Sequence, residues 1–327
     1  MINKIHFDKI IGKKVLVTGG LGFVGHNLVK ELVQKYKCDV TIVDNEINSA
    51  AAILSDISAA VTILKVSILD IEYKGFLETF DYIFHLACIQ IAHSSKDPLL
   101  DLQTNAISTL NMLEYLRHSP SSKLQRFVYT SSASVYGNAQ NGLCNEKGPT
   151  KVLSHYAATK LLGENYTSIY FKQYTIPTTS VRYSNVFGYG QSPKNTYCGV
   201  IGKFIDNAFQ DKNLFVFGDG QQTRDYTFIS DAVDATILAA VHPNALGEVM
   251  NVGTGVETSV NKLAEIIIAA SKAPLAVEHI PPRDIDNIRR RFTDISLIQD
   301  KLNWEPAITI EEGLKKTMDW YISNSIV

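Results

Sequence analysis

The sequence predicts an α/β fold in which a doubly wound parallel sheet is joined to a smaller C-terminal α/β part. Short apolar segments alternate with amphipathic helical segments through the first half of the chain. A glycine-rich segment joins the first predicted strand to the first predicted helix. The chain has 327 residues, of which 45% are hydrophobic, so it can bury a substantial core. Alternating strands and helices favour a parallel sheet that is covered on both faces.

The first half of the chain contains the elements of this sheet. Its strand segments are short, rich in Val, Ile and Leu, and bounded by polar residues or glycine. Strands are predicted at 14–18, 40–44, 62–66, 81–87, 126–132 and 178–188, the last of which runs into a loop. Apolar residues at helical spacing predict helices at 26–36, 101–117 and 156–174.

The second half has a different pattern, with shorter strands between helices. Helices are predicted at 195–210, 231–241, 261–272 and 310–322. Short strands are predicted within 214–230, 248–255 and 276–282, and an arginine cluster at 289–291 is assigned to a loop. We expect a first domain over 1–180 and a second domain mainly over 181–327, with segments at about 225–255 crossing back to the first.

Composition and charge exclude several classes of function. The net charge is −2 and the chain has no long basic run, so neither nucleic acid nor an anionic membrane is an expected partner. No apolar stretch reaches the roughly 20 residues that span a bilayer, and the N-terminus lacks an apolar signal core. The widely spaced cysteines suggest free thiols and no metal site. We expect a cytoplasmic protein.

The segment TGGLGFVG has glycines at Gly19, Gly22 and Gly25, between a predicted strand and a predicted helix. Glycine permits the tight turn and lets a pyrophosphate approach the backbone, while the helix N-terminus supplies N–H groups. The next strand ends at Asp44, beside Asn45. A carboxylate there accepts hydrogen bonds from the adenosine ribose and repels a 2′-phosphate. This context predicts NAD as the cofactor.

Two further segments carry candidate catalytic groups. The serine-rich segment TSSASVYG, which includes Ser132, follows the strand at 126–132, and ligands bind at the carboxyl ends of parallel strands. Tyr156 and Lys160 stand four residues apart in a predicted helix, so both side chains lie on one face. That spacing alone is common by chance and does not decide whether the pair is catalytic.

Taken in order, the motifs resemble those of the extended short-chain dehydrogenase/reductase family. They are TGGLGFVG, Asp44, HLA at 85–87, Asn105, SSASVYG, YAATK, RYSNVFG and GDGQQTRDY. The branch that this chain resembles most is the NAD-dependent nucleotide-sugar epimerases and dehydratases, with UDP-glucose 4-epimerase as the type. The resemblance extends from about residue 12 to 305, and it implies a Rossmann-type NAD-binding domain followed by a nucleotide-sugar-binding domain.

The resemblance also implies roles for individual residues. Tyr156 matches the catalytic base, Lys160 the lysine that lowers the pKa of the tyrosine, and Ser132 the residue that binds the reacting sugar oxygen. The implied NAD-binding residues are Gly19, Gly22, Phe23, Val24, Gly25, Asp44, Asn45, Ser67, Ile68, Leu86, Ala87, Asn105, Thr130, Tyr156, Lys160 and Tyr183. The implied substrate-binding residues are Gln90, Ser132, Asn185, Val200, Phe215, Phe217, Arg224 and Arg283.

Two departures from the family pattern weaken particular assignments. Ser67 stands where the family has an aspartate near adenine, so we expect a weaker contact there. The C-terminal R-x-G-D pattern reads RDID, and the following loop is about one residue longer. This puts the diphosphate-binding role of Arg283 in doubt, and Arg289 or Arg290 could take its place.

The residues that follow Ser132 favour one reaction. Family dehydratases and decarboxylases have carboxylates there, whereas this chain has Ala133 and Ser134. The hypothesis is a 4-epimerase that acts on a nucleotide-diphosphate sugar, most simply a UDP-sugar. A 4-keto-reductase, a dehydratase, another epimerase and a non-catalytic NAD-binding regulator remain alternatives. The nucleobase and the sugar stay open, and the helices at 101–117 and 156–174 suggest a homodimer.

Overall fold

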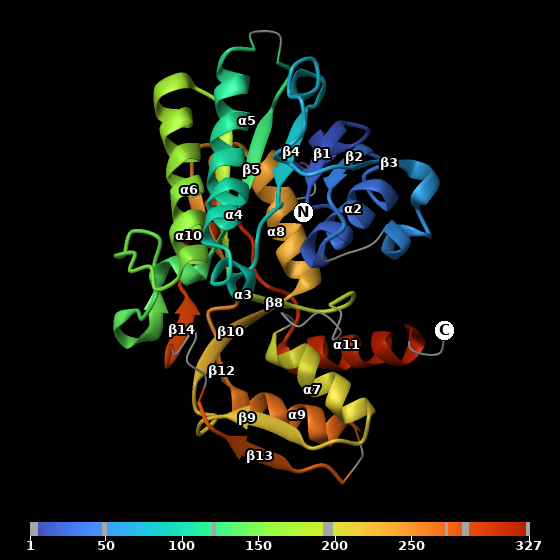
Figure 1. The fold of residues 1–327 in the computed structure, drawn as a ribbon, viewed down its shortest axis with the longest axis vertical. Coiled ribbons are helices and arrows are strands. Elements are labelled where there is room, and N and C mark those ends of the chain that lie inside the picture. Colours follow the sequence, from blue (N-terminus) through green and yellow to red (C-terminus); the bar gives the residue numbers. More distant parts are fainter. Residues whose placement is uncertain are drawn as a thin grey trace.

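The computed structural model describes residues 6–47, 51–119, 122–191, 199–271, 274–282 and 288–324. Its centre is a seven-stranded sheet with the order β11-β7-β5-β4-β1-β2-β3, and every neighbouring pair is parallel (Figure 1). The strands are β1 (Lys14–Thr18), β2 (Asp39–Asp44), β3 (Val61–Lys65), β4 (Tyr82–His85), β5 (Arg126–Ser132), β7 (Thr178–Tyr183) and β11 (Val249–Val252).

Helices cover both faces of this sheet. α2 (Phe23–Gln34) and α8 (Ile229–Val241) share one hydrophobic core, whereas α5 (Ser108–Arg117) and α6 (His155–Tyr174) cover the other face and stand side by side in Figure 1. Side chains along β5 alternate between the two cores. Val128 packs into the core with α2 and α8, whereas Phe127 and Tyr129 pack into the core with α5 and α6. The predicted Rossmann-type architecture is therefore confirmed.

The rest of the chain forms smaller sheets with their own helices. A second sheet has the order β12-β10-β14-β6, with β8 paired to β10, and β9 pairs with β13. These strands are β6 (Leu143–Cys144), β8 (Asn185–Phe187), β9 (Leu214–Phe217), β10 (Thr223–Phe228), β12 (Glu257–Ser259), β13 (Val277–Ile280) and β14 (Arg290–Thr293). The associated helices are α7 (Val200–Phe209), α9 (Val260–Ser271), α10 (Ser296–Leu302) and α11 (Ile310–Asn324).

Shorter helical segments connect these elements. α3 (Ile91–Ser94) and α4 (Pro98–Leu102) precede η5 (Gln103–Ile107), a π-helical turn that leads into α5. The predicted helix at 101–117 is thus helical throughout but has a wider turn inside it. The remaining segments are 3-10 turns at η1 (Asp8–Ile10), η2 (Ala51–Leu54), η3 (Ser58–Ala60), η4 (Leu77–Thr79), η6 (Ala133–Tyr136), η7 (Gln140–Gly142) and η8 (Pro243–Ala245).

The prediction of a loop at 289–291 was wrong, because β14 begins at Arg290. Its strand pairs Arg290 with Thr223 and Arg291 with Arg224 in β10. Arginine has no strong strand preference of its own, so pairing with a neighbouring strand decides the conformation here. β6 and β12 were also missed because they are two and three residues long.

The chain returns to the large sheet late in the sequence. β11 pairs with β7, and α8 packs against β5 and β7, although both elements follow β8 and β10 of the second sheet. The domain boundary near residue 180 stays a prediction. Across the described ranges, no helix is both long enough and apolar enough to cross a bilayer.

Candidate active site

The glycine segment forms a tight turn between β1 and α2. Gly19 has φ of +70°, and a Cβ there would lie 2.7 Å from the backbone nitrogen of Ala87. A Cβ on Gly25 would lie 2.1 Å from the carbonyl oxygen of Gly19. Gly22 is the N-cap of α2, so the free N–H groups of its first turn, including those of Phe23 and Val24, open at this turn. The geometry suits close approach of a pyrophosphate.

Asp44 lies beside this turn, at the end of β2. Its carboxylate accepts hydrogen bonds from the backbone N–H of Leu21 at 3.0 Å and of Glu46 at 2.9 Å. Asn45 next to it is exposed. Because Leu21 belongs to the glycine turn, the turn itself fixes the orientation of the carboxylate.

The ends of β3, β4 and β5 continue the same edge of the sheet. Ser67 and Ile68 follow β3, where the Ser67 hydroxyl accepts from the N–H of Leu69 at 3.2 Å. Ala87 donates its N–H to the hydroxyl of Thr18 at 3.2 Å, and Leu86 is buried beside it. These predicted NAD-binding residues therefore lie along one edge, next to the glycine turn.

Two other predicted NAD-binding residues use their polar groups within the protein. Thr130 donates its hydroxyl to the carbonyl of His85 at 3.2 Å. The Asn105 amide donates to the Ile89 carbonyl at 3.1 Å, and its oxygen accepts from the Ile89 N–H at 2.7 Å. These contacts give both residues a role in holding the strand ends and the loop after β4. Direct contact with NAD stays a prediction for both.

Ser132 ends β5, and its register partner on β7 is Tyr183. The Ser132 hydroxyl accepts from the backbone N–H of Ser134 at 3.1 Å and from the Ser134 hydroxyl at 2.9 Å. With its lone pairs occupied in this way, Ser132 is left to donate its own proton. The Tyr183 hydroxyl shares a 2.6 Å hydrogen bond with Thr236 on α8.

Tyr156 and Lys160 lie on the first turns of α6, whose N-cap Ser154 accepts from the N–H of Ala157 at 3.1 Å. Lys160 is only 2% exposed, and its ammonium lies 4.7 Å from the centroid of the Tyr129 ring. Burial lowers the pKa of Lys160, while the nearby Cys88, Asp101 and Glu164 act to raise it. The lysine is thus held in a dry environment with negative charge close by.

The pKa of Tyr156 is raised in this structure, whereas the family resemblance implies that Lys160 lowers it. Burial is the largest cause, since the phenolate is costly to form away from water. Hydrogen bonding with Ser132 and the positive charge of Arg291 act in the opposite direction. Ser132 and Tyr156 therefore meet as predicted, but the protein by itself keeps the tyrosine protonated.

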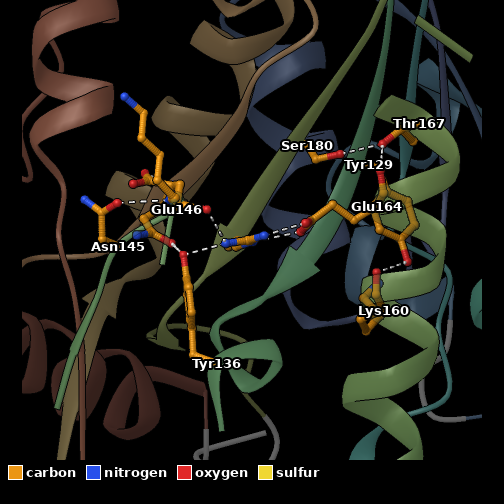
Figure 2. Close-up of polar contacts among 11 residues, drawn as sticks. Tyr129, Tyr136, Asn145, Glu146, Lys160, Glu164, Thr167 and Ser180 are labelled. Atoms are coloured by element: carbon orange, nitrogen blue, oxygen red, sulfur yellow. Dashed lines mark hydrogen bonds and ion pairs between the residues drawn. The ribbon is translucent and has the colours of Figure 1, made fainter. Parts of the chain in front are cut away.

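A buried polar network joins α6 to the turn η6, which follows Ser132 (Figure 2). Arg182 of β7 donates from Nε to Glu164 on α6 at 2.8 Å and from Nη1 to the Tyr136 hydroxyl at 2.7 Å. Tyr136, at the end of η6, donates to Asn251 of β11 at 2.7 Å. This network was not predicted from the sequence; its signal was the arginine near the end of the strand segment TTSVRY.

The predicted substrate-binding residues lie mainly on the smaller elements. Asn185 is in β8, paired with Tyr226 of β10. Val200 is the first residue of α7. Phe215 and Phe217 share the side of β9 that faces away from the core. Gln90, in contrast, lies on the cofactor side as the N-cap of α3.

The arginines separate into exposed and buried groups. Arg289 is exposed and paired with Asp219 at 2.7 Å, and Arg290 is exposed and paired with Glu257 at 2.7 Å. The suggestion that either replaces Arg283 is therefore corrected, because both face outward and carry their own carboxylate; Arg283 lies outside the described residues.

The buried group comprises Arg224 and Arg291, which are 8% and 7% exposed. They are register partners on neighbouring strands β10 and β14. Arg224 donates from Nη1 to the carbonyl of Ile288 at 2.7 Å. The positive charge of Arg291 acts to lower the pKa of Tyr156, which burial raises. Arg224 was predicted to bind substrate, whereas Arg291 was placed only in the arginine cluster at 289–291.

The site thus combines a glycine turn, the buried carboxylate of Asp44 at the end of β2 and a Ser–Tyr–Lys set. The model of the NAD-dependent epimerase/dehydratase family matches residues 15–253. The chain belongs to this family. It is therefore an enzyme of the epimerase/dehydratase family, and the resemblance inferred from the sequence motifs is confirmed.

Similar proteins extend over nearly the whole chain. The UDP-glucose 4-epimerase of Mycolicibacterium smegmatis is 34% identical over 317 residues, which are 95% of this chain and 99% of that protein. The UDP-N-acetyl-alpha-D-glucosaminuronate decarboxylase of Bacillus cytotoxicus is 32% identical over 321 residues, 94% of this chain and 98% of that protein. The UDP-glucuronic acid 4-epimerase of Bacillus cereus, solved with UDP-glucuronic acid and NAD, is 28% identical with a TM-score of 0.86, covering 95% and 99% of the two chains.

NAD is the cofactor of this epimerase/dehydratase family, and the residues present fit it. Gly19 and Gly25 allow the chain to turn tightly at the start of α2, because a Cβ on either residue would clash with the backbone of Ala87 or of Gly19. The N–H of Leu21 holds the Asp44 carboxylate beside this turn, at the strand end where the ribose-binding acid stands in folds of this type. A carboxylate at this place also disfavours a 2′-phosphate, which accounts for NAD in preference to NADP.

Proposed function

We propose that the protein is a nucleotide-sugar 4-epimerase. The observation that carries the proposal is the Ser132–Tyr156–Lys160 set without a carboxylate after Ser132. Ala133 and Ser134 follow it in the buried turn η6, and Ser134 is engaged in hydrogen bonds to Ser132. Neither residue can transfer the protons that water loss requires, whereas epimerisation needs only one base at the sugar oxygen.

Tyr156 takes the proton of the sugar C4 hydroxyl, and Ser132 orients that oxygen by donating a hydrogen bond. NAD, when bound, would supply the acceptor and donor of the C4 hydride. Burial raises the pKa of Tyr156, and the positive charges of Lys160 and of the oxidised cofactor would favour the phenolate and offset that effect. The 4-keto sugar then presents its other face, and Tyr156 returns the proton as the C4–H bond re-forms. Net redox change is zero.

The substrate is a nucleotide-diphosphate sugar, and a UDP-sugar is the first choice. Arg224 and Arg291 are buried side by side, and two adjacent guanidinium groups are well suited to a diphosphate. Phe215 and Phe217 mark the strand whose backbone would meet the nucleobase. The relatives from Mycolicibacterium smegmatis and Bacillus cereus act on UDP-sugars by name, which supports the choice of uracil.

We also propose a homodimer formed through α5 and α6, which line the outside of the large sheet. Ile169 of α6 is 40% exposed, and the neighbouring segments expose Leu99 of α4 at 73% and Leu153 before α6 at 63%. Exposed apolar surface of this kind is typical of subunit contacts. Sedimentation of the purified protein at increasing salt should give a stable dimer, and a monomer at micromolar concentration would contradict the proposal.

The purified chain with NAD⁺ should be assayed on UDP-glucose/UDP-galactose, their N-acetyl forms and UDP-glucuronic acid. An epimerase interconverts one C4 pair while absorbance at 340 nm shows no net NADH. Stoichiometric consumption of NADH by a 4-keto sugar would indicate a reductase instead. Release of CO₂ or formation of a 4-keto-6-deoxy sugar would indicate a decarboxylase or a dehydratase. Any of these outcomes would replace the proposal.

A further inference from the structure

A buried carboxylate lies next to the catalytic helix and has no role in the site as described so far. Asp101 is at the end of α4 and is 0% exposed. The next turn of the chain, η5, is π-helical. A π-turn inside a helix is uncommon and often marks a functional position. Burying a carboxylate is costly unless its oxygens are hydrogen-bonded, so the partners of Asp101 identify what it holds.

Each oxygen of Asp101 holds one neighbour of the catalytic groups. Oδ2 accepts from the hydroxyl of Thr159 at 2.9 Å, and Thr159 directly precedes Lys160 on α6. Oδ1 accepts from the Asn105 amide at 2.6 Å, and that amide also reaches Thr159 at 3.2 Å and the Ile89 carbonyl at 3.1 Å. The carboxylate therefore connects the catalytic turn of α6 with the loop after β4.

The charged or titratable groups that interact with Asp101 come from α6 and β5: Lys160, His155 and Tyr156 from α6, and Tyr129 from β5. Burial raises the pKa of Asp101, whereas the charges of Lys160 and His155 act to lower it. α3 contributes the hydroxyl of Ser94 beside the carboxylate, and η5 contributes only the Asn105 amide. In return, the negative charge of Asp101 raises the pKa of Lys160 and of Tyr156.

We propose that Asp101 is a positioning residue for the acid–base pair, holding the Tyr156–Lys160 turn of α6 against the loop that follows β4. The inference rests on the proposed epimerase function for its kinetic consequences. Through Thr159, Asp101 fixes where Tyr156 presents its hydroxyl. Through its charge, it keeps Lys160 cationic in a dry environment and sets the pH at which Tyr156 becomes a base.

The variant Asp101→Asn preserves shape but removes the charge and one acceptor. We expect kcat to fall about tenfold, the loss of one net hydrogen bond, with KM changed by less than about twofold. The sign of the pH effect follows from the charge. As long as Lys160 stays protonated, removing a negative neighbour lowers the pKa of Tyr156, so the acidic limb of the kcat profile, where activity rises as the phenolate forms, moves to lower pH.

Thr159→Val separates the two effects, because it breaks the hydrogen bond but keeps the Asp101 charge. It should reproduce the fall in kcat without moving the acidic limb. In the double variant, kcat should fall by less than the product of the two single-variant losses, since both substitutions remove the same contact.

Asp231→Asn is the matched control: Asp231 is also a buried carboxylate, held by the N–H groups of Ala307 and Ile308, but it lies on α8. It should lower stability and leave the pH profile unchanged.

Amide hydrogen exchange tests the contact without any substrate. In Asp101→Asn, peptides covering 155–160 should exchange faster than in the wild type, while those covering α8 should not. If the wild type epimerises no sugar, the epimerase proposal fails and the exchange result alone decides the role of Asp101. Should Asp101→Asn not fold, Thr159→Val carries the test. The inference is overturned if Asp101→Asn keeps the wild-type kcat and an unmoved acidic limb. It is also overturned if Thr159→Val keeps the wild-type kcat, or if amide exchange at 155–160 is unchanged in Asp101→Asn.

Discussion

At the scale of single residues, the proposed base Tyr156 occupies a buried position in which its ionised form is disfavoured. Burial raises the pKa of Tyr156, so the residue is protonated in the protein alone. Under the proposed mechanism, the positive charge of bound NAD would favour the phenolate, so the protonation state of Tyr156 would depend on occupation of the NAD site.

The first prediction concerns Tyr156 itself. Tyr156→Phe keeps the ring but removes the only group proposed to exchange the C4 proton. Turnover should fall about a thousandfold, in the usual range for loss of a general base. NAD affinity, measured by protein fluorescence quenching, should change less than about threefold because the cofactor contacts of the glycine turn remain. Turnover close to that of the wild type would reject Tyr156 as the base.

The second prediction distinguishes the arginines of β14. Arg291→Met should raise KM for a UDP-sugar about 10- to 100-fold, the loss expected from hydrogen bonds to a charged group. Arg290→Met is the matched control in the same strand, because Arg290 is exposed and paired with Glu257. Steady-state kinetics of both variants is the measurement. Equal KM values in the two variants would remove Arg291 from the substrate site.

At the scale of the elements, the buried network in Figure 2 fixes α6 relative to β7 and η6. Arg182 and Glu164 are 4% and 3% exposed and form a buried ion pair, and Arg182 also donates to the Tyr136 hydroxyl. Glu164 lies one turn after Lys160 on α6. The network therefore fixes the position of α6 relative to η6. Breaking it should mainly lower the free energy of unfolding.

The third prediction follows from this pairing. Arg182→Met leaves Glu164 buried without its partner and should lower the free energy of unfolding by about 3–5 kcal/mol. Tyr136→Phe removes the hydrogen bonds with Arg182 and Asn251 but leaves the ion pair, and it should cost about 2–3 kcal/mol. In Arg182→Met/Glu164→Leu the loss should be smaller than in Arg182→Met, because no uncompensated charge remains. Urea unfolding of the variants checks these values, and a larger loss in the double variant would contradict the explanation.

Much of the element order was predictable, because apolar periodicity and the glycine turn reflect local chemistry. β1, β5 and α6 lie within one residue of their expected limits. β14 was not predictable, since its conformation depends on pairing with β10 and β6. The same holds for Asp101 in the site. An aspartate within a helical segment resembles a solvated side chain, and only the packing of α4 against α6 buries it.

At the scale of the whole molecule, the two predicted ligand regions lie on different sheets. The NAD-binding residues follow the strand ends of the large sheet, whereas Arg224 and Arg291 belong to β10 and β14 of the second sheet. α8 contacts both sheets through β5, β7, β8 and β10. Cofactor and nucleotide should therefore bind independently, and each should stabilise the folded chain.

The fourth prediction is a pair of separate thermal shifts. NAD at about 100 times its Kd should stabilise the protein by about 2.7 kcal/mol, because it binds only the folded state. UDP should raise the unfolding temperature further in the presence of NAD, and more than dTDP, CDP or GDP. Differential scanning fluorimetry provides the measurement. If UDP gives no greater shift than the other nucleotides, the assignment of uracil is wrong.

The position of β11 (Val249–Val252) limits which fragments and chimeras of this protein can fold. Because β11 closes the large sheet beside β7, a fragment that stops after β7 would present that strand as an open edge with unpaired backbone groups. It would also lack α8, whose apolar side chains fill one face of the sheet. A chimera that exchanges substrate preference with a relative must keep α8 and β11 with the N-terminal segment and replace the sequence on either side of them. Substrate specificity can therefore be exchanged only by replacing two separate segments, not one continuous C-terminal segment.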